Sequence, residues 1–513
     1  MHRISLLLIT VVLLSGCAVN PVTGERELSL VSTQQEVAIG EQQYGPGRQM
    51  YGGDYVADPD VTEYVQRVGN RLAAVSDRDL PYEFVVINDS TPNAWALPGG
   101  KIAVHRGLLT EMGSEAELAA VLGHEIVHAA ARHGAQSMQR GMLLQGAMIA
   151  TSITANSSEY GSLLMTGAGL AAQLVNQKYG RDAERESDLY GMEYMSRAGY
   201  DPAAAVDLQR TFVRLSEGRD SSWVEGLFAS HPPSMERVEN NIETLASLPQ
   251  GGELGREAHA RSISRLIATK DAYAAHDRGR KALAQGDTAN ALAEAKTALA
   301  GEPNEALFHA LRGDVRSAQN RWDDALINYE RAVSMNGTYF YNLMRRGLAQ
   351  RQLGHIDRAA MDLERSIQLL PSPPALNALG EIRLEEGQRD AAMELFRAAA
   401  QSDSPDGRAA RNSLARLELP EKPYRYLPTR LGQDSAGRLV VEVQNPTGLS
   451  VEITELTFEV MVASGQVQTA AQSLRGRLDG GQSGQIPVDS RIAAAVTDPR
   501  NIRAAVTRAR IVD

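Results

Sequence analysis

A glycine and an alanine recur with nearly the same period in the second half of the chain, and this repeat constrains the fold more than any other feature. Successive positions are 34, 34 and 33 residues apart in both sets: Gly279, Gly313, Gly347 and Gly380; Ala291, Ala325, Ala359 and Ala392. Four unrelated helix pairs, the alternative, would not be expected to share two registers. A repeat of this length is one helical hairpin, which buries its apolar face only by stacking on its neighbours. We therefore expect an all-α array of hairpins over residues 272–415.

The alanine register carries a longer pattern that resembles the tetratricopeptide repeat. Ala325-x-x-x-Tyr329-x-x-Ala332 recurs with Phe in the central position at Ala392, and a weaker copy begins at Ala359. The resemblance implies a concave surface of stacked hairpins, which in such arrays binds extended peptides or partner proteins.

Charge and cysteine content exclude two classes of site. Lys and Arg number 52 against 63 Asp and Glu, which leaves a formal charge of −11. No global basic field is therefore available to hold a phosphate backbone, and we expect no nucleic-acid partner. A single Cys excludes an intrachain disulfide framework and a zinc site built on several thiolates. Metal ligands, if present, must be His and carboxylates.

That single cysteine lies directly after a segment that reads as a signal peptide. A short positive start precedes an apolar run over Ile4 to Leu14, which is too short to span a bilayer. Leu14-Ser15-Gly16-Cys17 resembles the bacterial lipobox, which implies a signal peptide over residues 1–16 and a lipid on Cys17. By resemblance to the bacterial sorting rules for such lipoproteins, Ala18 in place of Asp favours the outer membrane, with the body facing the periplasm. The alternative is an ordinary secretory signal with a chance Cys.

Three further regions surround the repeats. Residues 17–59 are expected to be a linker, because four glycines, Gly45, Gly47, Gly52 and Gly53, loosen the chain there. Residues 60–260 mix helical periodicity with short strands and predict an α+β domain. Within it, residues 142–172 are rich in Gly, Ala, Ser and Met, and we favour a buried or mobile helical hairpin over membrane contact. Residues 421–513 turn to strands at 439–443, 451–462 and 502–512 and predict a small β-sandwich with no evident chemistry.

Zinc chemistry is indicated by five consecutive residues, His124-Glu125-Ile126-Val127-His128, which form the motif H-E-x-x-H. Residues four apart share one face of a helix, so the two imidazoles can bind one Zn²⁺ per chain. From the 10 His and 63 acidic residues, chance would produce the motif about 0.02 times. We expect His124 and His128 to be ligands and Glu125 to take a proton from water as the water attacks a peptide carbonyl. A structural histidine pair is the alternative.

Two candidates compete for the third ligand position, and the first is His133. The extended motif H-E-x-x-H-x-x-G-x-x-H needs Gly at position 131 and His at position 134, where this chain has Ala131 and Gly134. The spacing therefore excludes His133 from that role.

The second candidate is Glu184 on a later helix. Glu184 and Asp188 share a helix face, whereas Glu186 points away from it. Glu184 can supply the third metal ligand, and Asp188 can accept a hydrogen bond from the free ring N–H of a ligating His. A solvated pair of acids is the alternative, because this spacing is common in charged helices.

Together these residues resemble the gluzincin metallopeptidases related to HtpX, and more closely the BepA-type family that joins a peptidase domain to tetratricopeptide repeats. Other matching segments are Asn20-Pro21-Val22-Thr23-Gly24, residues 93–100, and Ser230-His231-Pro232-Pro233 with Arg237. The resemblance covers about residues 20–400. Ser187 stands where the family usually has Ala, and the C-terminal β-region is not a family feature.

The resemblance implies roles for the remaining motifs. His231 can occupy a fourth metal position, which would leave no site for the hydrolytic water and make this residue a latch. Arg237 is expected to steady the oxyanion or its surroundings. The segment that begins Asn93-Ala94-Trp95-Ala96 is expected to be an edge strand onto which the substrate backbone adds.

The sequence favours one function and leaves one alternative. We expect an α+β zincin-like domain, an all-α repeat array and a β-sandwich in a periplasmic zinc endopeptidase lipoprotein of the outer membrane. Its substrates would be unfolded or misassembled envelope proteins, and its repeats would bind outer-membrane assembly machinery. The rival is a chaperone-like scaffold whose zinc is structural or latched.

Overall fold

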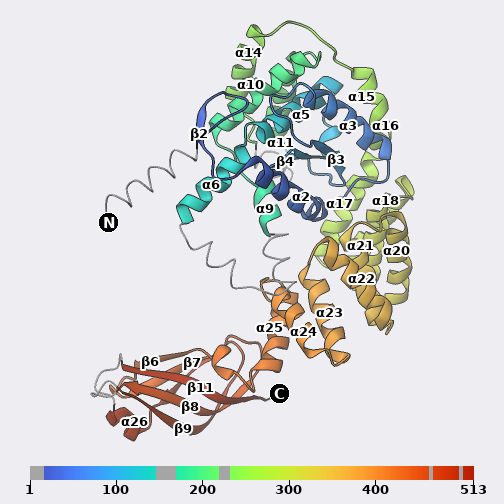
Figure 1. Cartoon of the computed structure of the whole chain (residues 1–513). Coiled ribbons are helices and arrows are strands. Elements are labelled where there is room, and N and C mark those ends of the chain that lie inside the picture. The colour runs from blue at the N-terminus through green and yellow to red at the C-terminus, as the bar shows by residue number, and fades with distance from the viewer. Residues whose placement is uncertain (1–16, 146–168, 219–230, 462–465, 496–500, 513) are drawn as a thin grey trace, which may run out of the picture. The chain divides into compact units, whose positions relative to one another are not determined.

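The computed structural model describes residues 17–145, 169–218, 231–461, 466–495 and 501–512 (Figure 1). The chain divides into two compact units, Met1–Pro371 and Ser372–Asp513. In the described part of the chain, no helix combines the length and the apolar character needed to cross a membrane. The expected hairpin at 142–172 falls mostly on residues 146–168, which lie outside the described residues.

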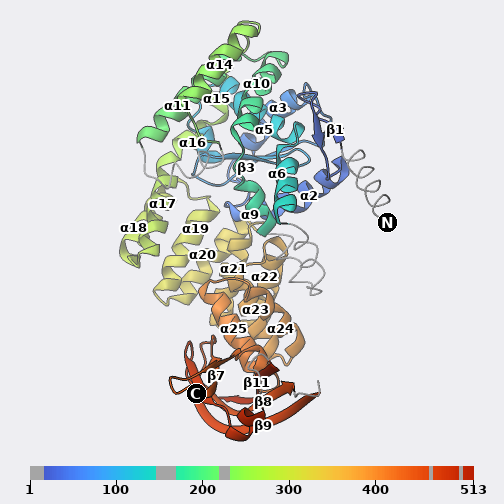
Figure 2. The same ribbon diagram turned by 90° about the vertical axis from the view of Figure 1, so that its left-hand side faces the viewer.

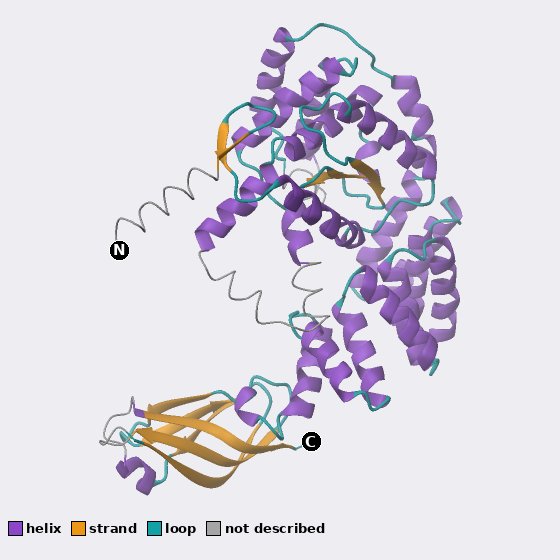
Figure 3. Ribbon diagram, in the orientation of Figure 1, coloured by secondary structure: helices purple, strands orange, loops and turns teal. Residues whose placement is uncertain are grey.

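The first unit begins with an α+β domain built around a three-stranded sheet. The sheet order is β3-β5-β4, with β3 (Glu83–Ile87) parallel to β5 (Lys101–His105) and β4 (Ala94–Leu97) antiparallel to β5. Figure 3 shows these strands enclosed by helices. The helices are α3 (Pro59–Ala73), α4 (Arg106–Leu109), α5 (Glu115–Ala130), α6 (His133–Gln145), α9 (Gly169–Val175), α10 (Arg181–Arg197), α11 (Ala203–Gly218), α14 (Met235–Ser247), α15 (Arg256–Ser262) and α16 (Ser264–Ala268).

Helix α5 forms the centre of this domain, and its start follows from side-chain capping. Ser114 Oγ accepts a hydrogen bond from the Glu117 N–H at 3.1 Å. The Glu117 carboxylate reaches back one residue further than a capping box requires and accepts from the Gly113 N–H at 2.8 Å. All fifteen residues from Glu115 to Ala130 other than Glu117 are buried.

Residues 17–59 are not a linker, which corrects the expectation from their glycines. Strands β1 (Cys17–Val19) and β2 (Arg26–Leu28) pair antiparallel, and α2 (Thr33–Met50) follows. Two glycines of α2 mark close packing. A Cβ at Gly40 would lie 2.0 Å from the Pro98 carbonyl oxygen, and one at Gly47 would lie 3.4 Å from the Trp95 ring. Of the other glycines, Gly45 has open space around it, and Gly52 and Gly53 follow the helix with positive φ values, as a turn requires.

Six repeat helices follow in the first unit, and Figure 2 shows them running in pairs. They are α17 (Lys270–Ala284), α18 (Thr288–Gly301), α19 (Ala306–Ala318), α20 (Trp322–Met335), α21 (Phe340–Gln352) and α22 (Ile356–Leu369). The recurring Gly lies in the first helix of each hairpin and the recurring Ala in the second. A Cβ at Gly313 would lie 2.5 Å from the Tyr329 ring, which explains why this position of the repeat requires glycine.

The second unit continues this pattern and then changes to strands. Helices α23 (Pro373–Glu385) and α24 (Arg389–Ala399) repeat the packing, since a Cβ at Gly380 would lie 2.7 Å from the Phe396 ring; α25 (Pro405–Glu418) follows. Two antiparallel sheets, β10-β7-β6 and β11-β8-β9, share one apolar core. The strands are β6 (Thr429–Gln433), β7 (Leu439–Gln444), β8 (Val451–Met461), β9 (Val467–Leu478), β10 (Ser483–Pro487) and β11 (Ile502–Ile511), with α26 (Ser490–Ala495) before β11.

Candidate metal centre

Four buried side chains from three parts of the α+β domain meet at one point. His124 and His128 come from α5, Glu184 from the first turn of α10, and His231 from the loop before α14. One ligand atom from each lies within 4.8 Å of every other. The structure thus brings together the three residues predicted from the motifs and His231, which was expected only from the family resemblance. Their role as metal ligands stays a prediction.

Four of the six distances between these atoms are close to those around a tetrahedral metal. Ligand atoms at about 2.0–2.1 Å from a tetrahedral Zn²⁺ are about 3.3 Å from one another. The Nε2 atoms of His124 and His128 are 3.0 Å apart, and His231 Nδ1 lies 3.3 Å from His124 Nε2. Glu184 Oε1 lies 3.5 Å from His128 Nε2 and 2.8 Å from His231 Nδ1. Three imidazoles and a carboxylate are also ligands that zinc accepts.

The charges around Glu184 favour its ionised form. Burial alone would raise the pKa of Glu184, but His231, His124 and a hydrogen bond with His128 hold that pKa well below its usual range. Burial also lowers the pKa of His128 well below its ordinary value. A carboxylate beside a neutral imidazole is the ligand pair that a cation requires.

Helices α5 and α10 approach closely because glycine faces glycine where they cross. A Cβ at Gly123 would lie 3.0 Å from the Gly191 carbonyl oxygen, and one at Gly191 would lie 3.0 Å from the His124 nitrogen. A Cβ at either position would be tighter than an ordinary contact, so the two helices would have to move apart by a few tenths of an ångström. Sequence reasoning missed this pair, although Gly123 directly precedes the H-E-x-x-H motif.

Glu125 lies beside the ligand cluster without joining it. Its Oε1 is 3.6 Å from His231 Nε2, and its Oε2 accepts no hydrogen bond from the described residues. Complete burial raises the pKa of Glu125, which makes this carboxylate a better proton acceptor than an exposed glutamate. The role of Glu125 as the proton acceptor stays a prediction from the motif.

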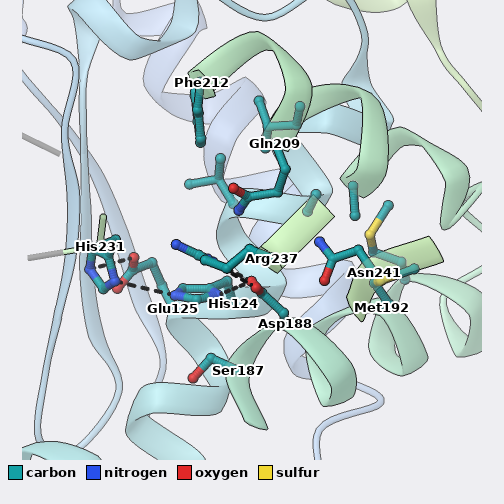
Figure 4. A pocket seen from close by; sticks show the side chains of 15 residues that line it. His124, Glu125, Ser187, Asp188, Met192, Gln209, Phe212, His231, Arg237 and Asn241 are labelled. Atoms are coloured by element: carbon teal, nitrogen blue, oxygen red, sulfur yellow. Dashed lines mark hydrogen bonds and ion pairs between the residues drawn. The ribbon is translucent and has the colours of Figure 1, made fainter. Parts of the chain in front are cut away.

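Asp188 supports His124 from the side away from the cluster (Figure 4). Its Oδ1 lies 2.9 Å from His124 Nδ1, the geometry that fixes the tautomer of a ligating His. Arg237 donates to both carboxylate oxygens of Asp188, at 2.8 and 2.7 Å, and its Nη1 lies 3.1 Å from Glu184 Oε2. These ion pairs leave little of the guanidinium for an oxyanion, so the geometry favours a positioning role for Arg237.

Tyr179 is a site residue that the sequence gave no reason to select. Its ring stacks on His128 with centroids 4.0 Å apart and an interplanar angle of 27°. Burial raises the pKa of the Tyr179 hydroxyl, so the phenol stays protonated and can donate a hydrogen bond. No motif or periodicity marks this residue, because it lies outside the helices that carry the ligands.

A cavity of about 40 Å³ opens beside His124. Its wall is mostly apolar and includes Val121, Met192, Met195, Leu208 and Phe212. Gln209 points toward it in Figure 4, and among the described residues nothing donates a hydrogen bond to the buried Gln209 Oε1. The cavity can therefore take a small apolar group that carries a donor.

The predicted substrate strand occupies an edge of the sheet. Strand β4 pairs only with β5 among the described strands, which leaves its outer edge unpaired. Asn93 and all four residues of β4 are nevertheless buried, and Trp95 belongs to a cluster with Leu174 and Val175 of α9.

Comparison with known proteins places this domain among metallopeptidases. The model of "Peptidase family M48" matches residues 59–244. Metalloprotease YcaL of Escherichia coli is 30% identical over 201 residues, which are 39% of this chain and 76% of that protein. The beta-barrel assembly-enhancing protease of Escherichia coli is 30% identical over 227 residues, 42% of this chain and 45% of that one.

The chain spans less than half of the length of the beta-barrel assembly-enhancing proteases that it matches. Among solved structures, the first TPR domain of human RPAP3 matches 24% of this chain and 97% of its own length, at 23% identity and a TM-score of 0.23.

Proposed function

The chain belongs to peptidase family M48, and from that premise we propose that it is a zinc-dependent endopeptidase. The observation that carries this proposal is the cluster of His124, His128, Glu184 and His231 with Glu125 directly beside it. Zinc held by these residues would supply Lewis-acid polarisation of a peptide carbonyl and activation of water.

The protein's own residues divide the remaining tasks. Glu125 accepts the proton of the attacking water and can return it to the leaving amine. Asp188 and Arg237 hold His124 and Glu184 in place through the ion pairs described above. The cavity beside His124 would accept an apolar side chain of the substrate, and β4 would pair with the substrate backbone.

We propose that the substrates are unfolded or misassembled proteins of the bacterial envelope. The name of the Escherichia coli relative links that protein to β-barrel assembly. In this chain, the hairpins α17–α22 follow the metal-site domain directly and could bring a bound chain or the outer-membrane assembly machinery to the site. The presence of His231 among four ligands favours one second candidate, a scaffold that binds such proteins while its zinc stays latched.

Zinc dependence is the test of the peptidase. An unfolded outer-membrane β-barrel protein should be cleaved by the zinc-loaded chain, by its His231→Ala variant, or by both, and dialysis against a chelator should stop cleavage. Adding zinc back should restore it, as followed by gel electrophoresis and mass spectrometry of the fragments. If neither protein cleaves this substrate while zinc is shown to be bound, the scaffold is the correct function.

The proposed anchor has its own test. Labelled palmitate should enter the wild-type chain in bacteria but not Cys17→Ser, because Cys17 is the only cysteine in the sequence. Ala18→Ser, which keeps the cysteine, is the matched control and should incorporate label. Label in Cys17→Ser would contradict lipidation at this residue.

A lipid at Cys17 would lie close to the metal-site domain, because Asn20 Nδ2 donates to the Ala131 carbonyl at the end of α5.

A further inference from the structure

His133, which its spacing excludes as a metal ligand, contacts a ligand directly. Its Nδ1 lies 2.9 Å from His128 Nδ1, and its Nε2 lies 3.1 Å from Glu186 Oε2. The His133 ring is buried, whereas the Glu186 side chain is 35% exposed. Ser187 Oγ lies 3.5 Å from His133 Nδ1. Three groups from α5, α6 and α10 thus form a line that leads from the metal cluster toward the surface.

The donor and acceptor roles along this line follow from the atom that faces the cluster. His128 presents Nε2 to the other ligands, so the lone pair for a metal is on Nε2 and the ring proton is on Nδ1. His128 Nδ1–H then donates to His133 Nδ1, which must be unprotonated to accept. The proton of a neutral His133 is therefore on Nε2, from which it donates to the Glu186 carboxylate.

We propose that His133 and Glu186 form a positioning pair that holds His128 in its metal-binding tautomer and ring orientation. The pair does for His128 what Asp188 does for His124, with an imidazole inserted between the ligand and the carboxylate. This inference rests on the metal-binding part of the proposed function and is independent of peptide cleavage.

The backbone between the two histidines is built to make this contact. Helix α5 ends at Ala130, and Arg132 has φ +66°, a left-handed conformation that is uncommon for a residue with a side chain. The Arg132 side chain is held by buried Glu36, at 2.7 Å from its Nε, and by the Val31 carbonyl. The reversal starts α6 at His133 and returns its ring to His128. A metal ligand at position 134, where the extended motif has its third His, would need a different backbone path after α5.

A purely structural role is the alternative, in which His133 only joins α5, α6 and α10. Zinc affinity separates the two roles, measured by competition with a chromophoric chelator. His133→Phe keeps a ring but cannot accept from His128, and we expect its zinc affinity to fall about 10–100-fold. His133→Gln offers an acceptor oxygen and should recover part of this loss. The thermal unfolding temperature of the metal-free proteins would fall in a structural role, and we expect the metal-free His133→Phe to stay near wild type.

Variants of the carboxylate keep the inference testable if His133→Phe does not fold. Glu186→Ala should weaken zinc binding several-fold, and Glu186→Gln, which still accepts from His133 Nε2–H, should weaken it less. Glu193→Ala removes an acid from the same helix, where it pairs with Arg197, and should leave zinc affinity unchanged.

Unchanged zinc affinity in His133→Phe, or in Glu186→Ala if that protein is the one that folds, would overturn the proposal. A protein that shows these affinity losses but cleaves no peptide would refute the peptidase and leave the positioning pair standing.

Discussion

Replacing Glu125 with Gln should reduce peptide hydrolysis by about 10²–10⁴-fold while zinc remains bound. Glu125 contributes no atom to the ligand cluster, so the metal loses nothing when the carboxylate becomes an amide. Gln has nearly the same shape but cannot take a proton at this position. Because burial raises the pKa of Glu125, the wild-type carboxylate is a better proton acceptor than an exposed glutamate, and the amide removes that function entirely.

The measurement needs cleavage rate and zinc content on the same preparations. Glu243→Gln, an identical change at an exposed position of α14, is the matched control and should behave as wild type. Hydrolysis at the wild-type rate in zinc-loaded Glu125→Gln would show that another group is the base. A loss of zinc together with activity would show instead that Glu125 helps to hold the metal.

The part of this site that was predictable from sequence is the part that helix geometry alone determines. His124 and His128 face one direction because they are four residues apart, and Glu184 and Asp188 share a face for the same reason. The contact between the two helices is not local, and it depends on Gly123 opposite Gly191. A single sequence shows both glycines but not that they meet.

The sequence was tested for His133 only as a metal ligand, so its contact with His128 was not predicted. The spacing argument removes His133 from the predicted ligands, and the cluster of possible ligands among the described residues is made of other side chains. The ring returns to His128 only because Arg132 adopts a left-handed conformation that Glu36, almost a hundred residues earlier, helps to fix. Glu36 belongs to the segment expected to be a linker, so that error and the omission of His133 have the same origin.

The repeats and the β-rich region differ in how much sequence pattern they carry. In the hairpins, a Gly in one helix accepts a large side chain from the next, so tight packing appears directly as a period. In the β-rich region, β7, β8 and β11 were predictable because they bury apolar side chains. Strands β6 and β10 have no buried residue, and β9 is mostly half-exposed or exposed, so hydrophobic pattern could not identify them.

Two roles for His231, a fourth metal ligand that blocks the site and a donor to the oxyanion, predict opposite effects of its replacement on the cleavage rate. Its Nδ1 lies within the ligand cluster, 2.8 Å from Glu184 Oε1, and its Nε2 is 3.6 Å from Glu125 Oε1. The ring therefore stands between the metal position and the general base, where the hydrolytic water would have to be. The next residues place it there, because Ser234 caps α14 and Arg237 in its first turn is bound to Asp188.

His231→Ala should therefore increase basal cleavage, including self-cleavage, because His124, His128 and Glu184 remain as three ligands and the fourth position opens to water. If His231 instead donates to the oxyanion, the same change should lower the rate by about 10²-fold or more. Turnover is compared with wild type at equal zinc occupancy. The double variant Glu125→Gln/His231→Ala is the control, and it should be inactive if the added cleavage arises at this site. A rate below wild type in the single variant would reject the latch and assign His231 to catalysis, because loss of a competing ligand can only expose the metal position.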